Sequence, residues 1–317
     1  MIDQFGRSIT YMRVSVTEFC NLRCRYCMPE DGVCKKRHED MLTQEETVMA
    51  VRAGASLGIK KLRITGGEPL IKPNILPLCR EAAAVDGIEE VCLTTNGTLL
   101  PALAAPLREA GVSRLNISLD TLDPDKYAYI TRHGKLEDAI KGIEAALSVG
   151  FEKIKINAVL IGGFNDDEIP ALAELTKLYP VDVRFIEMMP MVDSGDFGPE
   201  AFIPISEITS MLPELEKTAQ DGGVAKLYRL PGAKGNIGLI SPVSAHFCGE
   251  CNRLRLTADG KIKPCLHAAD EYSIKGLDYE DMVEQMRAAI LGKPQWHGEL
   301  SFYNRSHAER NMNQIGG

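Results

Sequence analysis

Short apolar runs alternate with longer amphipathic stretches over the first 190 residues of the chain. The runs have the length and β-branched composition of strands, which we predict at residues 13–16, 61–65, 90–94, 113–119, 153–160 and 181–188. The stretches between them carry apolar residues at helical spacing, which predicts helices near residues 43–57, 74–85, 99–110, 136–149 and 166–179. Regular strand–helix alternation predicts a parallel sheet built from βα units, and therefore an α/β fold.

The pattern changes after residue 190, where Pro, Gly and Asp interrupt the chain. We predict a helix near residues 206–212 and short strands near residues 225–230 and 237–240. Asp259-Gly260 predicts a two-residue hairpin turn. We therefore expect two regions: a partial βα barrel over residues 1–190, and a C-terminal α+β region over residues 191–317 that completes it.

The two faces of the predicted strands differ in polarity. One face is built of Val, Ile, Leu and Met, and must pack on the helices. The other carries polar and cationic residues such as Arg13, Arg63, Thr94, Ser118 and Lys155. A closed barrel fills its interior with branched apolar side chains, so a polar interior favours a ligand cavity. The alternative is an open sheet with one solvated face, which is unusual for parallel strands.

Arg184 interrupts the apolar run of the sixth predicted strand. A buried arginine without a partner is costly. Arg184 therefore either pairs with Glu187 or another nearby carboxylate, or it holds a ligand.

Composition narrows the possible partners. The 317 residues carry a net charge of −8, so no global cationic field attracts nucleic acid, and an anionic ligand needs a local cluster of Lys and Arg. No signal peptide and no apolar run of transmembrane length is apparent. Nine cysteines then fit metal sites or buried thiols better than a disulfide framework. We expect a cytoplasmic monomer or homodimer that binds neither nucleic acid nor membranes.

Three cysteines follow the first predicted strand with the spacing C-x3-C-x2-C, namely Cys20, Cys24 and Cys27. Ligation by thiolates alone suits iron–sulfur clusters or zinc. A four-iron cluster needs four ligands, so three cysteines leave one iron open for a substrate or cosubstrate. A zinc knuckle or a disulfide-forming loop is the alternative.

With Tyr26 just before the third cysteine, this motif resembles that of the radical S-adenosylmethionine enzymes. The resemblance implies that the open iron chelates S-adenosylmethionine, which one electron cleaves to a 5′-deoxyadenosyl radical. It also implies a laterally open, partial βα barrel. Gly66-Gly67-Glu68 closes the second predicted strand and resembles the family motif that binds the amino group of S-adenosylmethionine, although a tight turn explains two glycines equally well.

A second set of three cysteines is formed by Cys248, Cys251 and Cys265, which the predicted hairpin brings together. Alternation places Arg253 and Arg255 on one face of that hairpin. This set fits either a structural zinc, with His246 or His267 as the fourth ligand, or a second cluster with an open iron. In the second case the two arginines suit an anionic substrate such as a phosphate ester.

The two cysteine sets, the run of residues 238–266 and the terminal Gly316-Gly317 together resemble the GTP 3′,8-cyclases, which are lyases of molybdenum cofactor biosynthesis. The resemblance covers essentially the whole chain. It implies two four-iron clusters (4Fe–4S), S-adenosylmethionine as cofactor, and GTP as the substrate that becomes 3′,8-cyclo-7,8-dihydroguanosine triphosphate. It further implies an electron donor of the flavodoxin or ferredoxin type and a downstream pyranopterin monophosphate synthase.

Residue by residue, the resemblance assigns functions to positions of this chain. The expected cluster ligands are Cys20, Cys24, Cys27, Cys248, Cys251 and Cys265. The expected S-adenosylmethionine contacts are Tyr26, Gly67, Ser118 and Met189. The expected GTP contacts are Arg13, Arg63, Thr94, Lys155, Arg253 and Arg255. The expected catalytic residues are Arg13, Arg184, Arg253, Arg255, Gly316 and Gly317.

Several alternatives stay open at this level. The terminal glycines read either as a tail that reaches the active site or as a frayed terminus. Cys34, Cys79 and Cys92 match no cluster pattern, and the basic residues 34–38 suggest a solvated loop. Another radical S-adenosylmethionine enzyme with an auxiliary cluster, such as a peptide-modifying maturase, is the next enzyme candidate. A zinc-stabilised binding protein without redox chemistry is the candidate from a different class.

Overall fold

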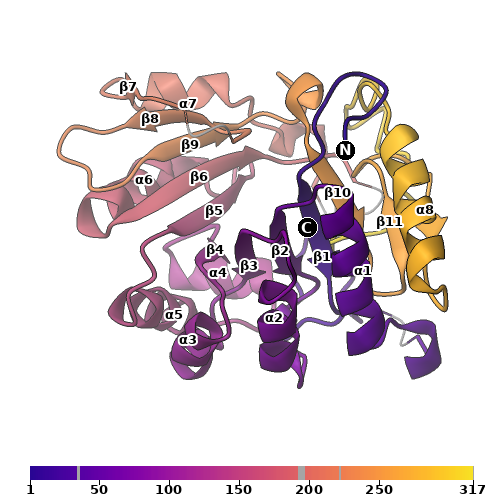
Figure 1. The fold of residues 1–317 in the computed structure, drawn as a ribbon. Coiled ribbons are helices and arrows are strands. Elements are labelled where there is room, and N and C mark those ends of the chain that lie inside the picture. The colour runs from indigo at the N-terminus through magenta and orange to yellow at the C-terminus, as the bar shows by residue number, and fades with distance from the viewer. Residues whose placement is uncertain (34–35, 192–196, 221–222, 317) are drawn as a thin grey trace.

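The computed structural model describes residues 1–33, 36–191, 197–220 and 223–316, and one twelve-stranded sheet runs through them (Figure 1). The strand order is β12-β11-β10-β1-β2-β3-β4-β5-β6-β9-β8-β7. The strands are β1 (Tyr11–Ser15), β2 (Lys61–Thr65), β3 (Glu90–Thr95), β4 (Arg114–Ser118), β5 (Ile154–Leu160), β6 (Val181–Glu187), β7 (Glu216–Lys217), β8 (Lys226–Arg229), β9 (Ile237–Ile240), β10 (Arg253–Leu256), β11 (Lys261–Lys263) and β12 (Tyr272–Ser273).

The helices lie between these strands in the chain. They are α1 (Gln44–Ser56), α2 (Ile75–Ala83), α3 (Leu100–Glu109), α4 (Pro124–Thr131), α5 (Leu136–Ser148), α6 (Ile169–Leu178), α7 (Ser206–Met211) and α8 (Tyr279–Leu291). Short 3-10 turns include η5 (Cys248–Glu250) and η6 (Met312–Gln314). Among the helices described, none combines the length and the apolarity needed to cross a bilayer.

The sheet is mixed and open, which confirms the predicted α/β partial barrel. Strands β10, β1 to β6 and β9 run parallel, while β11, β12, β8 and β7 extend the two ends as antiparallel strands. In the part of the chain that the structure describes, the end strands β12 and β7 do not pair, so the barrel is not closed. The C-terminal strands β10 and β9 flank β1 and β6, and the boundary at residue 190 stays a prediction.

The apolar faces of the strands pack on the helices, as the alternation predicts. Met12, Leu62, Leu93, Ile117 and Ile156 are fully buried in the principal hydrophobic cluster. Burying this face directs the alternate residues of each strand to the other side of the sheet. The polar face is thereby fixed around an interior space.

Two helices and the hairpin turn differ from the sequence-based expectation. Helices α4 and α8 were not predicted, although Asp123 and Asp278 cap their first turns with side-chain hydrogen bonds. The turn that follows β10 is wider than two residues. Beyond the end of β10 at Leu256, Thr257 N–H donates to the Lys261 carbonyl, which leaves residues 258–260 in the turn. The hairpin itself forms, and it returns Cys265 toward the start of β10.

Candidate active site

The polar face of the parallel strands lines a cavity of about 900 Å³. This cavity brings together all the predicted site residues except the terminal glycines. They are Arg13, Cys20, Cys24, Tyr26, Cys27, Arg63, Gly67, Thr94, Ser118, Lys155, Arg184, Met189, Cys248, Cys251, Arg253, Arg255 and Cys265. Their roles stay predictions. Cys79 and Cys92 are buried free thiols, and Cys34 lies outside the described residues.

The loop of the first cysteine set is held in place by main-chain hydrogen bonds. Arg23 N–H and Arg25 N–H donate to the carbonyls of Thr131 and Ile130 at the end of α4, each at 2.9 Å. Burial, together with the charges of Cys20 and Asp120, raises the pKa of Cys27 to about 12. This thiol therefore stays protonated in the absence of a cation. A bound metal centre would stabilise its thiolate form.

Gly67 and Glu68 have structural reasons for their identity. A Cβ on Gly67 would overlap the carbonyl oxygen of Phe19, so only glycine allows this close approach to the cysteine loop. The carboxylate of Glu68 accepts from Thr95 Oγ1 at 2.8 Å and from Asn96 N–H at 2.7 Å. The Gly-Gly-Glu segment thus fixes the first cysteine loop against β2 and β3.

Tyr26 is oriented by Asp120. Its hydroxyl donates to Asp120 Oδ2 at 2.7 Å, and the other oxygen of Asp120 accepts from Val159 N–H at 2.8 Å. Burial raises the pKa of Asp120 to about 6. The phenol is therefore fixed at the cavity wall beside the cysteine loop.

Lys293 hydrogen-bonds both segments that carry the second cysteine set. Its buried Nζ donates to the carbonyls of Arg253 at 2.9 Å and Pro264 at 2.6 Å, and it hydrogen-bonds the Cys251 thiol. Burial alone would raise the pKa of Cys251, but Lys293 and Arg253 lower it below its usual value. Sequence reasoning missed Lys293, because a lone lysine after a helix carries no signal of this contact.

Thiolate donors with N–H groups aimed at sulfur suit an iron–sulfur cluster, so both cysteine sets fit the predicted cofactor. Among the described residues, no group of three His, Cys, Asp or Glu side chains is arranged to hold a single metal ion. A four-iron cluster asks for a different arrangement, because each of its cysteines binds a different iron. His267, one of the two alternative zinc ligands, is buried with Nδ1 at 3.1 Å from Ser306 Oγ.

Three arginines form a row across the cavity wall. The register of β10, β1 and β2 places Arg255, Arg13 and Arg63 side by side. Burial and the neighbouring arginines lower the pKa of Arg255 to about 10 and that of Arg13 well below its usual value. Crowded cations of this kind favour an anionic ligand.

Tyr11 also belongs to this wall, and the sequence analysis missed it. Arg63 Nε donates to its hydroxyl, and the guanidinium of Arg253 lies 5.6 Å from its ring centroid. Burial opposes ionisation, but Arg63, Arg13 and Arg253 lower the pKa of Tyr11 to about 8. Strand alternation could have found it, since Tyr11 shares a face with Arg13.

Several buried polar atoms of the cavity wall have no hydrogen-bond partner within the described structure. They include Arg253 Nε, Arg114 Nε, Asn116 Oδ1 and Asn157 Oδ1. Buried polar groups are otherwise almost always paired. A polar ligand with both donors and acceptors therefore fits this wall.

The described part of the C-terminal tail, residues 310–316, enters the same region, so the alternative of fraying does not hold for these residues. Arg255 Nη1 donates to the carbonyls of Ile315 at 3.0 Å and Gly316 at 2.8 Å. Gly316 has a φ of +70°, and a Cβ there would lie 2.5 Å from Thr65 Cγ2. In this structure Arg255 therefore binds the tail, and Gly317 lies outside the described residues.

Comparison with known proteins agrees with this geometry. Residues 14–176 match the family model of the radical SAM superfamily, and residues 181–298 match that of Molybdenum Cofactor Synthesis C. Among solved structures, Streptococcus suis SuiB resembles the chain with a TM-score of 0.64 at 15% identity, covering 88% of this chain and 65% of its own. Methylornithine synthase (PylB) has a TM-score of 0.53 at 18% identity, covering 66% and 64%.

Curated relatives are much closer in sequence. The GTP 3′,8-cyclase of Alkaliphilus oremlandii is 47% identical over 323 residues, and that of Moorella thermoacetica is 46% identical over 327 residues. Each comparison covers all of both chains. The chain therefore belongs to the GTP 3′,8-cyclase family of the radical S-adenosylmethionine superfamily.

Proposed function

We propose that this chain is a GTP 3′,8-cyclase of molybdenum cofactor biosynthesis. The observation that carries the proposal is one cationic cavity with a set of three cysteines at each end of its parallel strands. Cys20, Cys24 and Cys27 follow the carboxyl end of β1. Cys248 and Cys251 precede the amino end of the parallel neighbour β10, and the antiparallel β11 leads to Cys265 on that same edge.

The residues present fit two 4Fe–4S clusters, each with three cysteines and one iron without a protein ligand. When bound, the first cluster supplies the electron that cleaves S-adenosylmethionine to a 5′-deoxyadenosyl radical. We assign the orientation of S-adenosylmethionine beside the first cysteine set to Tyr26, Gly67, Ser118 and Met189, which all line the cavity. Holding both reactants in one cavity supplies proximity.

The arginine row suits the triphosphate of GTP. Guanidinium groups bind phosphate oxygens in a planar, bidentate manner. Arg13 and Arg63 of this row and Arg253 of the same cavity wall present such groups, with Lys155 and Thr94 further along the wall. Because these cations crowd one another, an anionic substrate relieves their repulsion on binding.

Two macromolecular partners follow from this function. The cyclase needs a low-potential electron donor, and we assign that role to a protein of the flavodoxin or ferredoxin type. Its product needs a second enzyme, which we expect to be pyranopterin monophosphate synthase. We place the reaction in the reducing cytoplasm, where thiolate clusters persist.

Substitution of Arg253 tests the substrate assignment. In anaerobically reconstituted protein, Arg253→Ala should weaken GTP binding by roughly tenfold or more, because a charge-assisted hydrogen bond is lost. The matched control is Arg229→Ala on β8, whose guanidinium bonds only Asn236 Oδ1 among the contacts described. Unchanged GTP affinity in Arg253→Ala, or a loss of iron that accounts for the weaker binding, would contradict the assignment.

A further inference from the structure

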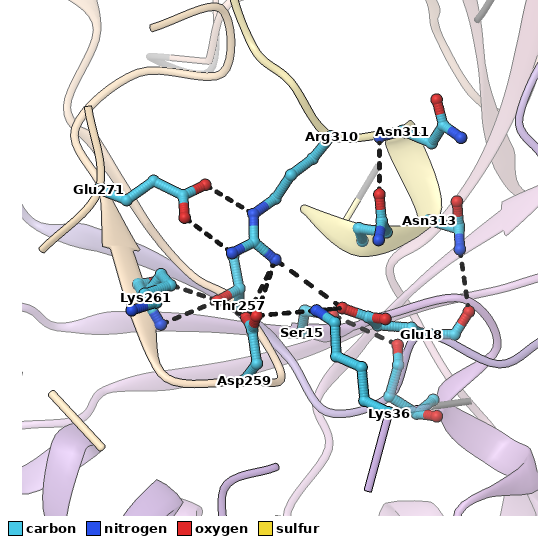
Figure 2. Close-up of polar contacts among 12 residues, drawn as sticks. Ser15, Glu18, Lys36, Thr257, Asp259, Lys261, Glu271, Arg310, Asn311 and Asn313 are labelled. Atoms are coloured by element: carbon cyan, nitrogen blue, oxygen red, sulfur yellow. Dashed lines mark hydrogen bonds and ion pairs between the residues drawn. The ribbon is translucent and has the colours of Figure 1, made fainter. Parts of the chain in front are cut away.

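Arg310 anchors the start of the C-terminal tail through ion pairs. Its Nε and Nη2 pair with the two oxygens of Glu271 at 2.6 and 2.7 Å, and Nη1 lies 3.1 and 3.0 Å from the oxygens of Asp259 (Figure 2). Glu18 Oε1 lies 3.8 Å from the same Nη1. The planar guanidinium thus binds Glu271 in a bidentate manner and Asp259 through the single nitrogen Nη1, which makes Arg310 a rigid junction between the two carboxylates.

Lys36 completes this junction from the other side. Its Nζ binds Glu18 at 2.6 Å and Asp259 at 2.8 Å (Figure 2). In the segment 34–38, for which we expected a solvated loop, Arg37 is exposed, and Lys36 is partly exposed while its ammonium group pairs with these two carboxylates. We call Glu18, Lys36, Asp259, Glu271 and Arg310 the Arg310 cluster.

The Arg310 cluster joins three parts of the candidate active site. Glu18 is buried and lies two residues before Cys20. Asp259 lies in the turn of the hairpin that carries Arg255 on β10. Arg310 begins the tail that ends on Arg255. The cysteine loop, the hairpin and the tail thus share one set of ion pairs.

The tail makes further contacts along the same path. Asn313 Nδ2 donates to the Glu18 carbonyl at 3.0 Å, and the main-chain N–H of Asn313 hydrogen-bonds the Cys27 thiol. Two residues later, the Ile315 carbonyl accepts from Arg255. The tail therefore runs from the first cysteine loop to the arginine row.

Arg310 supplies one of the three positive charges that balance this region, and among these cations it is the one that belongs to the tail. Lys263 also belongs to this balance, because its buried Nζ lies 3.3 Å from Glu271. The three carboxylates are Glu18, Asp259 and Glu271, and the three cations are Lys36, Lys263 and Arg310. Without Arg310, three carboxylates in a poorly solvated site share two cations. Breaking one member of such a network costs more than an exposed ion pair, because the remaining charges stay partly buried.

We propose that Arg310 is a positioning residue that seats the C-terminal tail in the cavity and couples it to the first cysteine loop through Glu18 and to Arg255 through Asp259. Its effect on catalysis rests on the proposed function, whereas its effect on the tail does not. Release of the tail removes the carbonyl partners of Arg255 and the main-chain donor to Cys27. Both ends of the active site then lose a contact at once.

The test compares variants of the full chain, reconstituted anaerobically. Arg310→Met removes the junction, and Arg310→Lys keeps its charge without the bidentate pairing. Lys36→Met removes the other bridging cation, which does not touch the tail. Arg287→Met is the control, since Arg287 is an exposed residue of α8 paired with Glu284. Hydrogen–deuterium exchange over residues 306–317 is measured together with kcat and KM for GTP.

Arg310→Met should raise exchange throughout the tail and lower kcat/KM for GTP by roughly 100-fold, as expected for misplaced catalytic groups, at unchanged iron content. Arg310→Lys should be intermediate on both scales, and Lys36→Met should keep the tail protected. Wild-type exchange in Arg310→Met, or equal effects of Lys36→Met and Arg310→Met, would overturn the proposal. If wild-type protein fails to cyclise GTP, the proposed function is wrong, while the exchange data still decide the role of Arg310.

Discussion

Arg13 and Arg255 lie directly opposite each other on the neighbouring parallel strands β1 and β10. Two guanidinium groups in register on a poorly solvated wall repel unless an anion or carbonyl oxygens lie between or beside them. For Arg255, the tail carbonyls of Ile315 and Gly316 supply that partner. This relationship explains why one wall of the cavity both holds the tail and suits a triphosphate.

Tyr11 predicts a pH dependence of GTP binding. Its pKa of about 8 means that the phenol loses its proton just above neutral pH. The resulting negative charge pairs with Arg63 and competes with phosphate, so binding favours the protonated phenol. GTP affinity should therefore fall as pH rises through 8, by up to about tenfold per unit above it. Equilibrium GTP binding between pH 7 and 9 measures this.

Tyr11→Phe is the matching variant, because it keeps the ring against Arg253 and removes the ionisable group. Its GTP affinity should show no decline at this pH. A decline in the variant equal to that of the wild type would assign the titration to another group.

Gly316 predicts a steric effect at the tail. An alanine there combines a strained positive φ with a Cβ 2.5 Å from Thr65 Cγ2. Gly316→Ala should lower kcat/KM for GTP by about tenfold or more, since the tail must shift away from Arg255.

Gly232→Ala is the control for backbone strain alone, because Gly232 has a φ of +74° with nothing within 4 Å of a Cβ. It should cost about 1 kcal/mol of stability and leave turnover unchanged. Equal activity of Gly316→Ala and wild type would show that the tail does not act in turnover.

Lys293 predicts an electrostatic effect on the second cluster. Lys293→Met removes a positive charge and a hydrogen bond beside Cys251, and both favour the more negative, reduced state. In Lys293→Met the reduction potential of the second cluster should fall by on the order of tens of millivolts. Lys293→Arg keeps the positive charge, so its potential should stay close to that of the wild type. Anaerobic redox titration followed by electron paramagnetic resonance measures the shift.

Lys275→Met supplies the comparison. Lys275 Nζ also donates to a main-chain carbonyl, that of Met41 at 2.7 Å, but it does not line the cavity. Its variant should leave both potentials unchanged. A potential in Lys293→Met that matches the wild type would restrict Lys293 to a packing role.

Much of the cavity wall was predictable because strand alternation is a local property. Arg13, Arg63 and Thr94 alternate with apolar residues that must face the helices, so their side of the sheet follows from the sequence. The cysteine spacings are likewise local, and they indicate which cysteines belong to the same set.

The contacts between distant segments were not predictable in this way. Lys293 meets Cys251 only because β10 docks beside β1, and Lys36 meets Asp259 only through the hairpin turn. The burial of Glu18 has no local signal either, since it depends on how the tail covers the first cysteine loop. Such residues become visible when the folded chain shows which charges balance one another.

The most direct test of the central claim uses anaerobically reconstituted wild-type protein with S-adenosylmethionine, in the presence and absence of GTP. We expect about eight irons per chain, as two four-iron clusters require. After reduction, 5′-deoxyadenosine should form faster with GTP, together with a cyclised guanosine triphosphate product. Deoxyadenosine formation that is indifferent to GTP would contradict the substrate, and zinc in place of iron would contradict the radical chemistry itself.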